Sequence, residues 1–187
     1  MSRLLLASAS PRRADLLRAA GFEFDVLPAD VDEAVHAGEL PEHYVRRLAD
    51  AKAAAVLGAA GQRVVLAADT VVVVDDHILG KPLDGRDAAR MLRLLSGRGH
   101  QVVTGVTIAT VAGRRLTRVE GTKVELAVMS GDEITWYVES GEPLDKAGAY
   151  AVQGLASRFV VRIEGSYSNV VGLPTALVHA MLKEMLT

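Results

Sequence analysis

The sequence predicts an α/β fold with a mixed sheet, and the order of its elements is the main reason. In the first half, short apolar strands alternate with segments of helical spacing, the pattern of βα units and parallel strands. Two long β-branched stretches, 102–111 and 116–128, then flank Ala112-Gly113, which indicates an antiparallel hairpin. Because ligands of such sheets bind at strand ends, we expect a cleft there.

The N-terminal half begins with a short buried strand and a helix with clear start and stop signals. Ser10-Pro11 is typical of an N-cap followed by proline at the first helical position, and Gly21 is the expected stop. The elements predicted up to the middle of the chain are a strand at 3–7, a helix at 10–20, a strand at 22–27, a helix from Pro41 to about Gly58, a strand at 64–68 ending in Asp69-Thr70, then an apolar stretch at 71–74 and a turn at 75–77.

The second half contains a hairpin, three helices and two loops. Ser130 and Glu133 have the spacing of a capping box and should open a helix through Ser140. The other elements predicted here are a helix at 86–96, a glycine-rich segment at 141–154, a strand at 159–163, a loop at 165–174 and a final helix to Leu186.

Length and composition exclude several classes of protein. The 187 residues, half of them hydrophobic, suit one large domain or two lobes that share a core, and no separable linker divides residues 1–187. A net charge of -2 argues against nucleic-acid binding, and the lack of cysteine excludes disulfides and thiolate sites. The apolar run at the start is far shorter than the roughly 20 residues of a membrane helix. We therefore expect a cytoplasmic protein with no membrane partner.

The segment Ser8-Ala-Ser-Pro-Arg-Arg13 has the chemistry of an anion site. It joins a strand to a helix N-terminus, where free N–H groups and the helix dipole attract anions. Arg12 and Arg13 are unfavourable next to that dipole unless an anion is bound, and guanidinium groups bind phosphate in a bidentate manner. Two solvated surface arginines are the alternative interpretation.

Asp69 is a candidate for catalysis. A carboxylate that follows five apolar residues can hold a divalent cation or orient a water, although a turn-forming Asp before Thr70 is an equal alternative. Asp32 and Glu33 lie in an acidic loop that offers oxygen ligands for Mg²⁺ or Mn²⁺ or is merely solvated. Lys52 and Lys81 are possible phosphate partners or ordinary surface lysines.

Several familiar catalytic patterns are absent from the sequence. The five histidines have no metal-binding spacing, and no P-loop, dinucleotide or hydrolase-elbow motif occurs. Scattered cations and acids without a covalent nucleophile suit metal-assisted attack of water on a phosphoanhydride.

An ordered set of short motifs over nearly the whole chain resembles the Maf family. The set consists of residues 8–13, Ala68-Asp-Thr70, Gly80-Lys-Pro82, Thr104-Gly-Val106, 141–150 with Gln153-Gly154, and 165–174. The resemblance implies an elongated two-lobed α/β fold around a central cleft, similar to inosine triphosphate pyrophosphatases. It also implies a divalent metal (Mg²⁺ or Mn²⁺), a cytoplasmic location and a homodimer.

The resemblance also implies an activity and site residues. The segment from Asp145 to Gln153 is similar to that of dTTP/UTP pyrophosphatases, whereas the 7-methyl-GTP subgroup carries a cysteine there. By this likeness Asp69 is the proton acceptor and, with Glu33, a metal ligand. The residues that would bind substrate are Ser8, Arg12, Arg13, Lys52, Thr70, Lys81 and Gln153, of which Arg12, Thr70 and Gln153 bear on substrate choice.

Two alternatives to a dTTP/UTP pyrophosphatase stay open at the level of sequence. The family is linked to inhibition of septum formation, so a nucleotide-binding regulator without essential turnover is one. A pyrophosphatase for a modified purine triphosphate is the other. For Gln153 itself, the alternative to base recognition is a glutamine that caps loop carbonyls.

Overall fold

A computed structural model describes residues 3–186. Met1, Ser2 and Thr187, the ends of the single domain expected over residues 1–187, lie outside this described part. The elements follow in the order β1 (Leu4–Leu6), α1 (Pro11–Ala19), β2 (Phe24–Val26), α2 (Pro41–Leu57), β3 (Val64–Val74), β4 (His77–Leu79), α3 (Gly85–Leu95), β5 (Gly99–Ala109), β6 (Arg115–Leu126), α4 (Gly131–Glu139), the 3₁₀ helices η1 (Glu142–Asp145), η2 (Ala147–Ala149) and η3 (Leu155–Phe159), β7 (Val160–Glu164), α5 (Tyr167–Val171) and α6 (Thr175–Leu186).

The strands form a mixed sheet, as the sequence predicted. Its order is β2-β1-β3-β5-β6-β7, and β4 pairs with β3. β1 is parallel to both β2 and β3, whereas the β3–β4 and β6–β7 pairs are antiparallel. The βα units at the start of the chain therefore supply the parallel strands.

The chain divides into two compact units. Unit 1 contains the described residues up to Asp69, Thr104–Glu120, and those from Gly172 onward. Unit 2 contains Thr70–Val103 and Gly121–Val171. Strands β3, β5 and β6 each give one part to unit 1 and the other to unit 2.

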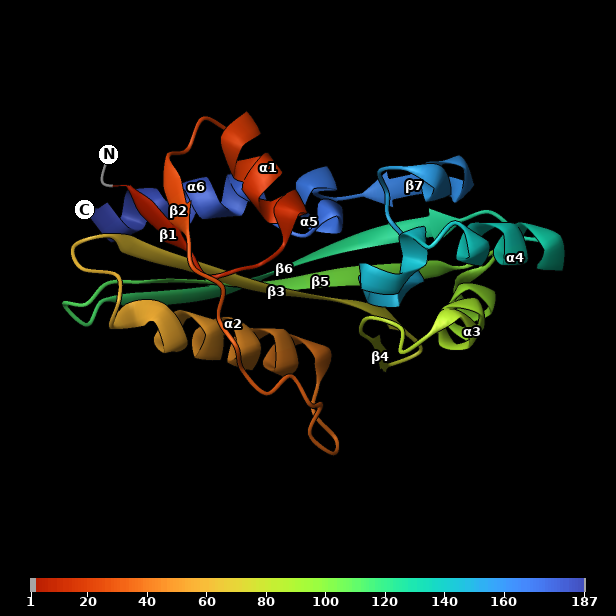
Figure 1. Ribbon diagram of the computed structural model, residues 1–187, viewed down its shortest axis with the longest axis horizontal. Coiled ribbons are helices and arrows are strands. Elements are labelled where there is room, and N and C mark those ends of the chain that lie inside the picture. The colour runs from red at the N-terminus through yellow and green to blue at the C-terminus, as the bar shows by residue number, and fades with distance from the viewer. Residues whose placement is uncertain (1–2, 187) are drawn as a thin grey trace. The chain divides into compact units, whose positions relative to one another are not determined.

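In unit 1, helices cover both faces of the sheet. Alternate strand residues point to opposite faces, so each strand packs against helices on both sides. Leu4 and Leu6 of β1 pack with apolar residues of α1 and α6, whereas Leu5 packs with apolar residues of α2. Figure 1 shows the same arrangement, with α1 and α6 on one side of β1 and β3 and α2 on the other. Burial on both faces explains why these strands are continuous apolar runs.

In unit 2, α3 packs against α4, and one core forms around them. Both helices begin at side-chain caps: Asp84 accepts a hydrogen bond from the Asp87 N–H, and Ser130 and Glu133 form the predicted capping box. Tyr137 of α4 is the largest fully buried side chain of this core.

Two sequence predictions about element boundaries were wrong. β3 does not end at Asp69-Thr70 but continues to Val74, because the Asp69 carboxylate has a cationic partner and can be tolerated inside a strand. The predicted loop at 165–174 contains the short helix α5, whose first turn is held by a hydrogen bond from the Asn169 N–H to Ser166 Oγ.

No helix within residues 3–186 has both the length and the apolar character that a membrane span requires.

Candidate active site

The centre of the candidate site is a buried ion pair between β3 and α2. Lys52 Nζ lies 2.6 Å from Asp69 Oδ1, and both residues are less than a tenth exposed, at 8 % and 7 %. Lys52 lies four residues after Leu48 and four before Val56, on the buried stripe of α2. Its aliphatic stem therefore packs in the core while its ammonium group reaches the strand.

Glu33 also contacts this lysine. Its Oε1 lies 2.5 Å from Lys52 Nζ, although the Glu33 side chain is half exposed. Two carboxylates, one on a strand and one in the acidic loop, thus converge on a single cation.

Burial raises the pKa of the Asp69 carboxyl, and the charges of Lys52 and Arg13 counteract this by favouring the ionised form. Oδ1 accepts the Lys52 hydrogen bond, and no described residue donates one to the other carboxylate oxygen. Asp69 is therefore a carboxylate with an unused acceptor and a greater proton affinity than a solvated aspartate, which are two properties of a general base.

Arg13 and Ser8 are joined at the start of α1. The Arg13 guanidinium donates through Nε to the Gly172 carbonyl at 2.8 Å and through Nη1 to Ser8 Oγ at 3.1 Å. Ser8 Oγ also accepts the Ser10 N–H at 3.2 Å, so its own O–H remains to donate. Ser10 occupies the N-cap position as predicted, but its side chain makes no capping bond.

The electrostatics of Arg13 extend to the ion pair. Burial lowers the pKa of Arg13, and the charges of Asp69 and Glu33 counteract this. Arg13 is thus bound within unit 1. This differs from the alternative interpretation of the sequence, in which Arg13 is a solvated surface arginine. Arg12 is half-buried on the same helix turn.

The acidic loop is held by residues that were not predicted from the sequence. The Tyr44 hydroxyl donates to the Glu33 carbonyl at 2.9 Å, and Arg47 forms an ion pair with Glu39 at 2.7 Å and donates to the Ala34 carbonyl at 3.0 Å. The Arg47 guanidinium lowers the pKa of Glu39 to about 2. Tyr44 and Arg47 are three residues apart at the start of α2, a spacing that puts both on the face next to the loop and is visible in the sequence.

Unit 1 therefore brings together Ser8, Arg13, Glu33, Lys52 and Asp69, with Arg12 beside them in α1. The other predicted substrate-binding residues belong to unit 2. Thr70 follows Asp69 in β3 and is half-buried, Lys81 is exposed after β4, and Gln153 is exposed before η3.

The residues present fit an open magnesium or manganese site. Among residues 3–186, no three or more His, Asp or Glu side chains gather in a group that would enclose an ion. Mg²⁺ is usually bound by one or two carboxylates, with substrate phosphates and water completing its shell. Glu33 and Asp69 already share one cation, Lys52, and supply this kind of incomplete oxygen set.

The sequence matches the model of one known protein family. A family model described as Maf-like protein matches residues 3–185. The chain belongs to the Maf family. The resemblance inferred from the ordered motifs is thereby confirmed.

Proteins of three named organisms are similar to this one along almost the whole chain. A dTTP/UTP pyrophosphatase of Anaeromyxobacter dehalogenans (strain 2CP-C) is 54 % identical over 97 % of this chain and 93 % of its own. One of Koribacter versatilis (strain Ellin345) is 51 % identical over 96 % and 93 %, and one of Hahella chejuensis (strain KCTC 2396) is 49 % identical over 97 % and 92 %.

Solved structures confirm the fold. A HAM1 protein from Coxiella burnetii has a TM-score of 0.56 at 17 % identity, over 98 % of this chain and 100 % of its own. The Staphylococcus aureus Ham1 protein has a TM-score of 0.50 at 15 % identity, with the same coverage. At such low identity these likenesses concern the fold alone.

Proposed function

We propose that this Maf protein is a nucleoside triphosphate pyrophosphatase that hydrolyses dTTP and UTP to the monophosphate and pyrophosphate. The observation that carries the proposal is the buried Asp69–Lys52 pair beside Arg13 and Glu33, a base and cations in one place. Three relatives of about half-identical sequence are named dTTP/UTP pyrophosphatase, which supports the same substrate class here.

In the proposed reaction, the oxygen of a water forms a bond to the α-phosphorus while the bond to the bridging oxygen breaks. Pyrophosphate leaves with the electron pair of that bond, and Asp69 accepts the proton of the attacking water. A divalent metal held by Glu33 and Asp69 would lower the pKa of that water. The raised proton affinity of Asp69 reduces the difference in pKa that proton transfer must overcome.

The cations of the site would bind the phosphates. Arg13 is held in place by Gly172 and Ser8, so its guanidinium is oriented before substrate arrives. Arg12, Lys52 and Lys81 would add positive charge where negative charge develops on the leaving pyrophosphate. The Ser8 hydroxyl retains a proton to donate to a phosphate oxygen.

Substrate choice is proposed to depend on Arg12, Thr70 and Gln153. The Gln153 amide offers both donors and an acceptor, which matches a pyrimidine edge that carries O2, N3–H and O4. Its side chain makes no hydrogen bond to a described residue, so capping of loop carbonyls gains no support from the structure. The proposed assembly of the protein is a homodimer, and its proposed location is the cytoplasm.

The test is incubation of the protein with a panel of canonical and modified triphosphates and Mg²⁺ or Mn²⁺, with products identified. We expect monophosphate and pyrophosphate in equal amounts, with dTTP and UTP the best substrates. Asp69→Asn should reduce turnover at least about a hundredfold while nucleotide still binds, because the shape is kept and the base is lost.

Asp15→Asn, which removes an exposed carboxylate paired with Arg18, is the matched control and should keep full turnover. Release of orthophosphate in place of pyrophosphate would overturn the proposed reaction. Nucleotide binding without turnover would favour a regulatory role, and a purine optimum would reject the pyrimidine preference.

A further inference from the structure

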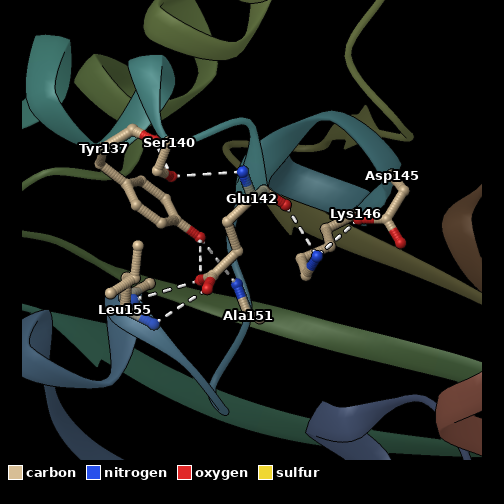
Figure 2. A network of polar contacts seen from close by, with 8 residues as sticks. Tyr137, Ser140, Glu142, Asp145, Lys146, Ala151 and Leu155 are labelled. Atoms are coloured by element: carbon tan, nitrogen blue, oxygen red, sulfur yellow. Dashed lines mark hydrogen bonds and ion pairs between the residues drawn. The ribbon is translucent and has the colours of Figure 1, made fainter.

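A polar network in unit 2 surrounds the segment that carries Gln153. Glu142 lies at the start of η1, and its carboxylate accepts the Leu155 N–H at Oε2 (3.0 Å) and the Ala156 N–H at Oε1 (3.4 Å). The Tyr137 hydroxyl donates to Glu142 Oε1 at 2.9 Å and accepts the Ala151 N–H at 3.3 Å. Figure 2 shows the Glu142 carboxylate in contact with Tyr137 and Leu155, and the Tyr137 hydroxyl in contact with Ala151.

The network holds the segment on both sides of Gln153. Ala151 is bound two residues before it and Leu155 two residues after it, through the same pair of side chains. Gln153 itself is exposed and has no hydrogen bond from its side chain to a described residue. The backbone is thus fixed while the amide is left for a ligand.

Glu142 and Tyr137 are themselves held rigidly. Tyr137 is fully buried in α4, and burial together with the Glu142 contact raises its pKa, so the hydroxyl keeps its proton and donates it. The Glu142 N–H donates to Ser140 Oγ at 3.2 Å, and the Glu142 carbonyl accepts from Lys146 Nζ at 2.7 Å.

Gly154 shows how closely the carboxylate approaches the segment. Its φ of +96° is a backbone conformation that residues other than glycine rarely adopt. A Cβ built on Gly154 would lie 2.5 Å from Glu142 Oε2. The glycine after Gln153 is therefore required by the position of Glu142.

We propose that Glu142 and Tyr137 are positioning residues for base selection, because they fix the segment Ala151–Ala156 in the one conformation that presents the Gln153 amide to the nucleobase. The inference rests on the proposed function and names the device behind its pyrimidine preference. A side chain that binds the nucleobase distinguishes one base from another only if its donors and acceptors are held in place. A mobile amide would adapt to the wrong base.

The test is Tyr137→Phe, which keeps the ring in the core and removes only the hydroxyl. Values of kcat/KM are measured for dTTP and dATP, together with hydrogen exchange of the Ala151 amide. We expect the ratio of the two kcat/KM values to fall about three- to tenfold, as the loss of one ordered hydrogen bond implies. Exchange at Ala151 should become faster.

Glu142→Gln is the second variant, in case Tyr137→Phe unfolds. It keeps one acceptor but turns an NH₂ group towards N–H donors, and the same fall in the ratio is expected. Ser96→Ala is the matched control, because it removes a hydroxyl that accepts the Met129 N–H at 2.7 Å elsewhere in unit 2. It should lower stability without changing the ratio.

The decisive measurement repeats Tyr137→Phe in a Gln153→Ala background, where the ratio should not fall further. An unchanged ratio in Tyr137→Phe, a fall of equal size in Ser96→Ala, or a further fall in the Gln153→Ala background would overturn the inference and leave a purely structural network. So would a Gln153→Ala variant with the ratio of the wild type.

Failure of the proposed function is separable from these outcomes. If the wild-type protein turns over no triphosphate, the proposed function fails. The ratio of the dATP to dTTP dissociation constants in the same variants, measured by calorimetry, then tests the inference with the same expected and contrary results.

Discussion

Lys52 Nζ and Asp69 Oδ1 lie 2.6 Å apart, in a place where both residues are almost completely buried. A buried carboxylate without a partner is strongly unfavourable, so this contact is what allows β3 to carry an aspartate in its interior. The same contact places a cation against the candidate base.

Removal of the lysine should therefore destabilise the protein more than removal of the pair. Lys52→Met keeps the aliphatic stem but leaves the Asp69 charge buried, with an expected loss of about 3 kcal/mol in the free energy of unfolding. Lys52→Met with Asp69→Asn should recover most of that loss. Denaturant unfolding of the two single variants and the double variant measures the coupling, and additive losses would contradict the role of the pair.

Arg13 should support both the fold and phosphate binding. Arg13→Ala removes the contacts to Gly172 and Ser8, so stability falls, and it also removes the guanidinium proposed to bind phosphate. We expect dTTP affinity to fall at least about tenfold and thymidine affinity to change little, as measured by calorimetry. Arg18→Ala, on the exposed side of the same helix, is the control. An equal loss for dTTP and thymidine would assign Arg13 to the fold alone.

Much of the fold was predictable because local signals and tertiary packing agree. Pro11, the Ser130–Glu133 capping box and the apolar run at 64–68 act within a few residues, and each indicates the element that the structure contains. The sequence also shows an acid, Asp69, at the end of an apolar run. The error was to end the strand there, since the partner that makes a charge tolerable in β3 lies 17 residues earlier in the chain.

The parts that could not be predicted depend on contacts between distant residues. The bond from the Tyr44 hydroxyl to the Glu33 carbonyl and the bonds that the Glu142 carboxylate accepts from the Leu155 and Ala156 N–H groups have no periodic signature, because turns bring these groups together. From the sequence, Gly154 was recognised only as part of the motif Gln153-Gly154. The structure identifies what approaches it: the Glu142 carboxylate.

His100 should make the stability of the protein depend on pH at values above the usual pKa of carboxyl groups. It is buried in β5 with Nε2 2.7 Å from the Tyr150 hydroxyl, and burial lowers its pKa from 6.5 to about 4. Below pH 6.5 the unfolded chain binds a proton at this histidine while the folded protein does not, so stability falls as the pH decreases towards 4.

The expected loss from this histidine is about 2 kcal/mol between pH 7.5 and pH 5, from a difference of about 2.5 between the two pKa values. His100→Gln keeps an amide to pair with the Tyr150 hydroxyl and cannot titrate, so its stability should be flatter over the same range. Denaturant unfolding at several pH values measures the two slopes. Equal slopes in the variant and the wild type would show that folding does not lower the pKa of His100.

Gly105 should be the least replaceable residue of the segment Thr104-Gly-Val106. A Cβ built on Gly105 would lie 2.3 Å from the Val45 carbonyl oxygen and 2.5 Å from its carbonyl carbon, and both are backbone atoms of α2. A flexible side chain could move aside, but here the whole helix must shift away from β5. Val45 and Leu48 are completely buried, so the shift would disturb the core beneath α2.

Gly105→Ala should therefore lower the free energy of unfolding by about 3 kcal/mol, the upper end of the usual cost of overpacking. Gly99→Ala is the matched control, because Gly99 lies on the same strand and a Cβ there would meet no atom within 4 Å. It should leave stability unchanged or slightly higher, since alanine suits a strand better than glycine. Turnover should fall more in Gly105→Ala than in Gly99→Ala. Because α2 carries Lys52, a shift of the helix lengthens the contact between Lys52 and Asp69. Pyrophosphatase activity should therefore fall in Gly105→Ala even at temperatures where the variant remains folded. Full activity in a folded Gly105→Ala variant would show that the site does not depend on the close packing of α2 against β5.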